Sequence, residues 1–152
     1  MTVERIFIAK AAGGPQVECE SVVVVAGSGI EGDRYFGRAD ERGQNVTLIE
    51  AEELEAFMGE RGDPCDVSMT HRNLITRGIR LNELVGKEFV IGNVKLKGVE
   101  LCEPCLGLGS ALASPELSAA AVVKRFLHRA GLRADALSSG VITRGAKVTS
   151  AA

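Results

Sequence analysis

The sequence predicts a mostly β protein, an antiparallel, barrel-like single domain over residues 1–152 with two or three peripheral helices. Segments with a strand pattern outnumber helical ones by about six or seven to two or three, and they come in hairpin-sized pairs instead of alternating with helices. The chain is 45% hydrophobic and 25% charged, as in an ordinary globular protein. A chain of this length buries roughly 68–70% of its unfolded surface, so it needs no disulfide.

The first elements are predicted strands. Apolar residues spaced among charges indicate a strand over residues 2–10, and the Ala-Gly-Gly-Pro sequence at 12–15 is typical of a turn. Residues 16–26 are dominated by the β-branched run Val22–Val25. They predict one long, well-buried strand.

A glycine-rich loop follows at residues 27–37, with four glycines in eleven positions and the opposite charges of Asp33 and Arg34. Such a loop can bring its backbone close to a ligand. It is not a phosphate-binding loop, because it lacks the Gly-Lys-Ser/Thr ending and the Gly-x-Gly-x-x-Gly spacing. A surface loop with turn glycines explains it equally well.

Residues 45–49 predict a short strand that runs into a helix. Thr47 and Glu50 have the spacing of a capping box, and Gly59 and Gly62 are expected to stop the helix. Residues 63–80 are rich in turn signals.

The hairpin of residues 87–91 and 94–101 is the best-defined element. Apolar residues alternate in both arms, and Gly92-Asn93 forms a two-residue turn. The second arm leads directly to Cys102, and Pro104 then ends the strand because it cannot donate a backbone hydrogen bond.

The clearest helix is predicted from Pro115 to Ala130. Ser114 is its expected N-cap, and Gly131 is expected just past its C-terminus. Residues 140–149 predict a closing hairpin.

Charge and hydropathy exclude two classes of partner. With 18 basic and 20 acidic residues the net charge is −2, and no run of like charge would attract nucleic acid. The longest apolar run, Val22–Ala26, is too short to cross a membrane. The chain is therefore expected in the cytoplasm, where thiols stay reduced.

Cys102 and Cys105 have C-x-x-C spacing, which is compatible with several chemistries. A redox pair of the thioredoxin kind opens a helix, whereas this pair ends a predicted hairpin. A zinc ribbon needs a second pair, which Cys19 and Cys65 do not supply. A single reactive or metal-ligating cysteine with a helper, or two buried small hydrophobes, remain. We favour a buried role for Cys102 and a reactive or metal-binding role for Cys105.

These residues resemble the MOSC domains, named for the C-terminal domain of molybdenum cofactor sulfurases. The matching blocks cover roughly residues 20 to 145 and occur in the family's order. They are GIEGDR at 29–34, NVTLIE at 45–50, RNL at 72–74, LVGKEF at 84–89, LCEPC at 101–105 and HRAGLRA at 128–134.

The resemblance implies a compact β-barrel in which Cys105 is the functional thiol. In such proteins this thiol carries sulfur as a persulfide or ligates the molybdenum of a pterin cofactor. The cofactor's phosphate implies nearby guanidinium groups. The implied cofactor-binding residues are Arg72, Asn73, Arg133, His128, Arg34 and Asp33.

The chain departs from the family pattern at two places: Ala146 follows Gly145 where an aspartate is common, and His71 precedes Arg72 where a second arginine is common. The pyridoxal-phosphate-dependent desulfurase domain of full-length sulfurases has no counterpart, so no pyridoxal phosphate site is expected.

Three functions follow as hypotheses. The first is a molybdenum-pterin protein that acts in sulfur transfer or in the reduction of N-hydroxylated compounds. The second is a non-catalytic sulfur or cofactor carrier for a partner, such as a sulfur donor or an electron-transfer protein. The third is a cytosolic dithiol redox protein, in which Cys102 and Cys105 form a reversible disulfide.

Overall fold

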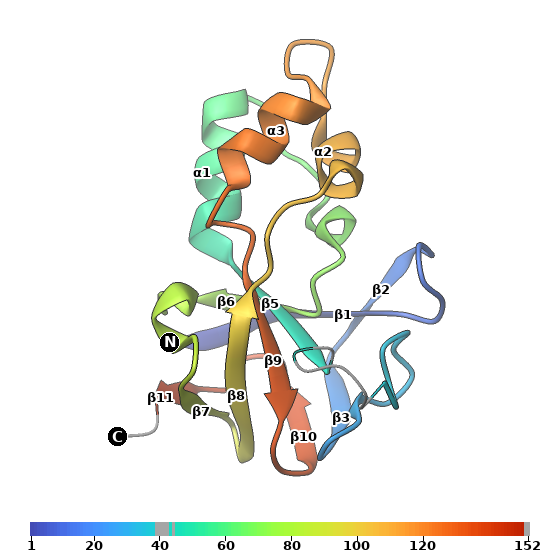
Figure 1. The fold of residues 1–152 in the computed structure, drawn as a ribbon, viewed down its shortest axis with the longest axis vertical. Helices are drawn as coiled ribbons and strands as arrows, with labels where there is room; N and C mark the ends of the chain where they lie inside the picture. Colours follow the sequence, from blue (N-terminus) through green and yellow to red (C-terminus); the bar gives the residue numbers. More distant parts are fainter. Residues whose placement is uncertain (39–42, 44, 151–152) are drawn as a thin grey trace.

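The computed structural model describes residues 1–38, 43 and 45–150 and is rich in strands (Figure 1). Its helices and strands follow one another along the chain. The strands are β1 (Thr2–Ala9), β2 (Gln16–Cys19), β3 (Ser21–Val25), β4 (Gly29–Ile30), β5 (Val46–Glu50), β6 (Leu74–Arg77), β7 (Glu88–Ile91), β8 (Val94–Leu101), β9 (Leu132–Ala136), β10 (Gly140–Thr143) and β11 (Val148–Ser150). The helices are α1 (Ala51–Arg61), α2 (Leu106–Leu112) and α3 (Ala119–Phe126), with short 3-10 turns η1 (Val67–Thr70) and η2 (Leu81–Leu84).

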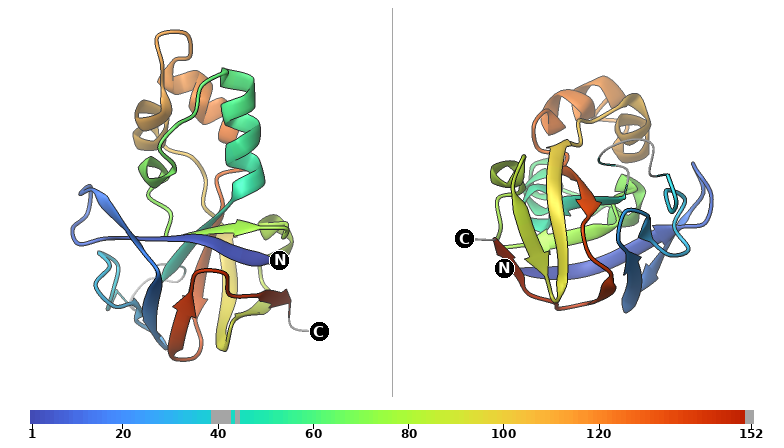
Figure 2. Two further views of the ribbon diagram at one scale, coloured as in Figure 1. Left: turned by 180° about the vertical axis from the view of Figure 1, so that it is seen from behind. Right: turned by 60° about the horizontal axis from the view of Figure 1, so that its bottom comes forward.

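The main sheet has eight strands in the order β11-β7-β8-β9-β5-β6-β1-β2, and β10-β3-β4 form a second sheet. All neighbouring pairs are antiparallel except β5 and β6. The main sheet curls until its β11 edge meets β1, where Val148 N–H donates to Met1 O (3.0 Å) and Val3 N–H to Ala146 O (2.9 Å). The right view of Figure 2 shows the strands arranged around a common interior. The predicted mostly β, barrel-like fold is confirmed.

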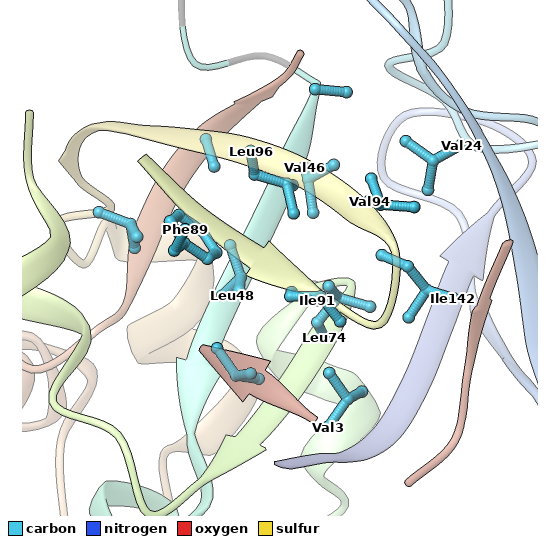
Figure 3. Close-up of a cluster of buried hydrophobic side chains, with 14 of the residues drawn as sticks. Val3, Val24, Val46, Leu48, Leu74, Phe89, Ile91, Val94, Leu96 and Ile142 are labelled. Carbon is cyan, nitrogen blue, oxygen red and sulfur yellow. The ribbon is translucent and has the colours of Figure 1, made fainter. Parts of the chain in front are cut away.

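Two hydrophobic clusters hold the layers together. The first fills the barrel, where labelled side chains from β1, β5, β7 and β8, such as Leu48 and Phe89, point toward one another (Figure 3). The second lies between the outer face of the sheet and the helices, where the rings of Phe57 and Phe126 are 5.0 Å apart. The helices therefore stand as a separate layer on one end of the barrel (Figure 1).

The predicted hairpin is confirmed as β7 and β8, and α1 ends at the expected Gly62, which has the left-handed φ of 83°. The capping box is wrong. Glu50 is the N-cap residue but makes no side-chain cap, and Thr47 bonds to Asn73 instead. The strand therefore continues to the first residue of the helix.

The helix predicted from Pro115 to Ala130 is shorter in the structure. Ser114 and Leu117 exchange two backbone hydrogen bonds in a tight turn, and the side chain of Ser118 caps α3 by accepting from Ala121 N–H at 3.2 Å. Sequence periodicity alone could not distinguish these two serines, because both precede apolar residues.

Three strand predictions were wrong. The single strand over residues 16–26 is two strands in different sheets, with Glu20 at the corner between them. The closing hairpin over 140–149 is also two strands, of which β10 pairs with β3 and β11 with β7. The turn-rich segment 63–80 contains β6, which is completely or nearly buried except at Arg77. In each case pairing with a distant strand decided the outcome.

No helix in the described part of the chain is long and apolar enough to cross a membrane.

Candidate functional site

A cavity of about 340 Å³ lies where the barrel meets the helical layer. Its walls come from the β1–β2 turn, the loop after β4, β5, the end of η1, the connection from β8 to α2, and β9. The lining residues are Gly13, Arg34, Tyr35, Thr47, Thr70, His71, Arg72, Cys102, Glu103, Cys105, Gly107, Leu108 and Arg133. Its size is within the range of small-molecule sites.

Four of the seven predicted site residues line this cavity: Arg34, Arg72, Cys105 and Arg133. They come from segments up to 99 positions apart, since the first is residue 34 and the last residue 133. The fold therefore brings the three arginines and the thiol of Cys105 to one cavity.

Arg72 fixes the back of the cavity. Its Nε donates to Ala130 O (2.9 Å), Nη1 to Thr70 O (3.0 Å) and Nη2 to Cys102 O (3.4 Å). The guanidinium thus ties η1, the start of β9 and the cysteine loop together. Among the described residues it has no carboxylate partner, and burial together with the charge of Arg133 lowers its pKa. It is a partly buried positive charge that an anion or a thiolate in the cavity can neutralise.

Arg34 is held in place by Asp33. The buried Asp33 carboxylate accepts from Ala9 N–H (3.1 Å) and from Arg34 Nη1 (3.1 Å), while Arg34 Nη2 donates to His71 O (2.7 Å). The guanidinium also stacks 4.5 Å from the centre of the Tyr35 ring. Asp33 therefore orients Arg34 and does not itself line the cavity.

Arg133 is the most adaptable of the three arginines. It lies on β9 and its side chain is 30% exposed, with Nε 3.8 Å from Glu100 Oε1. Within the described part of the chain its terminal nitrogens make no hydrogen bond, so both can donate hydrogen bonds to a planar or tetrahedral anion. Arg72 supplies fixed charge, whereas Arg133 has free donors.

Cys105 is the N-cap residue of α2. The backbone N–H groups of Leu108 and Gly107 lower the pKa of its thiol, with a smaller contribution from the charge of Arg72, although the side chain makes no capping hydrogen bond. The side chain is also exposed. An accessible, stabilised thiolate is the form of cysteine that reacts and binds metals. The sequence missed α2, because Leu106-Gly107-Leu108-Gly109 is rich in glycine.

The pKa shifts predict an order of thiol reactivity. Burial raises the pKa of Cys19 and Cys65 above the ordinary value, whereas that of Cys105 lies below it. Because only the thiolate is alkylated, Cys105 should react with iodoacetamide at a lower pH than the other two. Peptide mass spectrometry after short exposures from pH 6 to 9 measures this; faster labelling of Cys19 or Cys65 at pH 7 would contradict it.

Cys102 plays a different part. It is 3% exposed, and Cys102–Cys105 has neither turn nor bend. Both thiols are free, and Cys102 is buried whereas Cys105 is exposed. Cys105 is the N-cap residue of α2, and the dithiol redox hypothesis stays a prediction, tested by whether a mild oxidant links the two thiols.

Besides Asp33, two predicted site residues lie outside the cavity. Asn73 is fully buried, where its side chain accepts from Thr47 N–H (3.1 Å) and donates to Phe7 O (3.1 Å), so it joins β5 to β1. The side chain of His128 is 76% exposed, and its Nδ1 lies 3.4 Å from Glu103 Oε1. Both residues support the segments that form the site.

The sequence did not single out Tyr35, Thr70, Glu103 or Gly13 as parts of this wall. His71 begins the cationic stretch at 71–74 and departs from the family pattern, but a lone histidine is usually structural. Tyr35, Thr70 and Glu103 lie within two positions of Arg34, Arg72 and Cys105, whereas Gly13 belongs to the predicted turn at 12–15.

A family model described as MOSC domain matches residues 26–149, most of the chain. The chain belongs to the MOSC domain family. MOSC domains are associated with the molybdenum cofactor, and the matched region contains the cavity apart from Gly13.

Solved structures share the fold of this MOSC domain. The YuaD protein from Bacillus subtilis is 20% identical with a TM-score of 0.83, covering 96% of this chain and 92% of that one. YiiM from Geobacillus stearothermophilus is 16% identical (TM-score 0.73, 99% and 75% covered), and YiiM from Escherichia coli 17% (0.67, 100% and 70%). No curated protein matches the sequence.

Proposed function

We propose that this MOSC domain binds a molybdenum-pterin cofactor in the cationic cavity, with the Cys105 thiolate as its protein ligand, and reduces N-hydroxylated compounds. The observation that carries the proposal is the convergence of three guanidinium groups and one stabilised thiol on a single cavity. Family membership supports the cofactor class.

The charges of the cavity suit an anionic cofactor. Arg72 is partly buried and has no carboxylate partner among the described residues. The terminal nitrogens of Arg133, which make no hydrogen bond in the described part of the chain, can bind a phosphate through two parallel hydrogen bonds. A phosphate would offset both charges, whereas a neutral ligand would leave Arg72 uncompensated. Arg34, fixed by Asp33, gives the cavity a third positive wall.

The donor set suits a metal that arrives with an organic chelator. In the described part of the chain no three His, Cys, Asp or Glu side chains gather to hold a metal ion. Cys105 is one soft thiolate, which suits a transition metal. When bound, the cofactor would supply two-electron redox chemistry at the metal. The chain would hold the phosphate, present the thiolate and leave the cavity mouth open to substrate.

Metal and pterin analysis tests this proposal directly. Protein purified from a host that makes the cofactor should contain molybdenum and pterin in equal amounts and should convert phenylhydroxylamine to aniline when given a chemical electron donor. The same protein from a host unable to make the cofactor is the control. Full-length protein that contains neither molybdenum nor pterin after purification under anaerobic conditions would contradict the proposal.

Sulfur carriage on Cys105 is the second candidate, and the exposure of the thiol favours it. A partner, such as a sulfur donor, could reach this sulfur without rearrangement of the barrel. Under this alternative the protein would accept a persulfide and show no turnover of hydroxylamines; an electron-transfer partner would then be unnecessary.

A further inference from the structure

His71 adopts a backbone conformation that few residues other than glycine adopt. Its φ is 57° and ψ 26°, in the left-handed region. His71 N–H donates to Ser68 O (3.2 Å), and its carbonyl accepts from Arg34 Nη2 (2.7 Å). Such strained conformations gather at functional sites. The fold thus holds His71 in this position from two sides.

His71 is one of the residues that line the cavity, and it is partly buried. Its imidazole makes no hydrogen bond within residues 1–38, 43 and 45–150. The other charged or titratable groups of this wall are three arginines, two cysteines, Tyr35 and Glu103. Burial, followed by the charges of Arg34 and Arg72, lowers the pKa of the ring. The protonated ring is therefore a stronger acid than a free histidine.

The guanidinium groups and Cys105 are less suited to deliver a proton. A guanidinium stays protonated near neutral pH, and under the proposed function Cys105 is occupied as a ligand. Reduction of an N-hydroxy compound requires one proton on the departing oxygen as the N–O bond breaks. The imidazole of His71, on the wall of the same cavity, is able to give that proton near neutral pH and regain it from water.

We propose that His71 protonates the leaving hydroxyl oxygen of the bound N-hydroxy compound. This inference rests on the proposed function. As the N–O bond breaks, one proton passes from a ring nitrogen of His71 to the oxygen, and one from solvent reaches the nitrogen. The bound cofactor would supply the two electrons. The products are the amine and water. His71 is thus a catalytic residue at a position where the family commonly has arginine.

The first test uses cofactor-free protein and two-dimensional NMR of the imidazole protons. The chain has two histidines, so His128, which is exposed and outside the cavity, is an internal control. Inorganic phosphate is the probe. Phosphate held by the arginines should raise the pKa of His71 and leave that of His128 unchanged. A His71 pKa that does not respond would overturn the inference, because the ring would then lie away from the bound anion.

The second test compares the pH profiles of loaded wild-type protein and His71→Asn, with phenylhydroxylamine as substrate. Asparagine tolerates the left-handed backbone but carries no proton near neutral pH. The wild-type kcat should fall as pH rises through the His71 pKa, and the variant should lose about 100-fold in kcat together with this pH dependence. Variant kcat and profile equal to wild type would overturn the inference alone. A wild-type protein that contains cofactor but shows no turnover would overturn both the inference and the proposed reduction.

Discussion

Cys105→Ser is expected to abolish retention of molybdenum and to lower the reduction of phenylhydroxylamine to background. Sulfur is the soft donor of the cavity, and a serine hydroxyl stays protonated and binds molybdenum weakly. Since loss of an outer-shell partner already costs 10–100-fold in metal affinity or activity, loss of the ligand itself should cost at least about 100-fold. Metal analysis and turnover of wild type and variant from the same host measure the effect.

Cys19→Ser is the matched control for that substitution. Cys19 lies on β2, away from the cavity, and burial raises the pKa of its thiol. The control should keep its molybdenum and activity, and both variants should unfold near the wild-type temperature. Molybdenum and turnover that survive Cys105→Ser would refute the role of Cys105 as metal ligand, whatever else the cavity binds.

Arg72→Met is expected to destabilise the fold and the site together. The substitution removes the three hydrogen bonds to Ala130, Thr70 and Cys102, and leaves their carbonyls without these donors. Bonds from a charged donor contribute about 1.5–3 kcal/mol each; relief of the buried, unpaired charge offsets part of the loss. We expect a net decrease of roughly 2–4 kcal/mol in the free energy of unfolding. The pKa of Cys105 should rise, because Arg72 helps to lower it.

Arg133→Met separates binding from stability. This side chain is partly exposed and makes only a long contact with Glu100, so the free energy of unfolding should change by less than about 0.5 kcal/mol. Retention of the pterin should nevertheless fall about tenfold or more, because the free donors for phosphate are gone. Urea denaturation and pterin analysis of both variants decide the outcome. Equal losses of stability in the two would contradict the division of roles between these arginines.

The sequence predicted the general architecture because local patterns record which face of a strand is buried. Alternation in residues 87–101 indicated β7 and β8, and Gly62 marked the end of α1. It did not predict the parallel pairing of β5 with β6, nor the split of residues 16–26 between two sheets. Those outcomes depend on strands that lie far away along the chain, and local periodicity contains no information about them.

The sequence also predicted only part of the candidate site. By itself the sequence determined that Cys105, Arg34, Arg72 and Arg133 belong to an ordered set of MOSC motifs, since motif order survives without coordinates. Only the tertiary structure decided that these four residues share one cavity and that Asn73 and His128 do not. It also decided that His71 belongs there.

Sequence and tertiary structure contain different information about a side chain. Residue type fixes what a side chain can do, so a thiol and a guanidinium can be recognised from the sequence. The partners of a side chain decide which of these possibilities it realises. Arg72 donates its hydrogen bonds to backbone carbonyls from three segments. The terminal nitrogens of Arg133, by contrast, make no hydrogen bond in the described structure. These partners lie up to 58 positions away from Arg72, and folding alone brings them together.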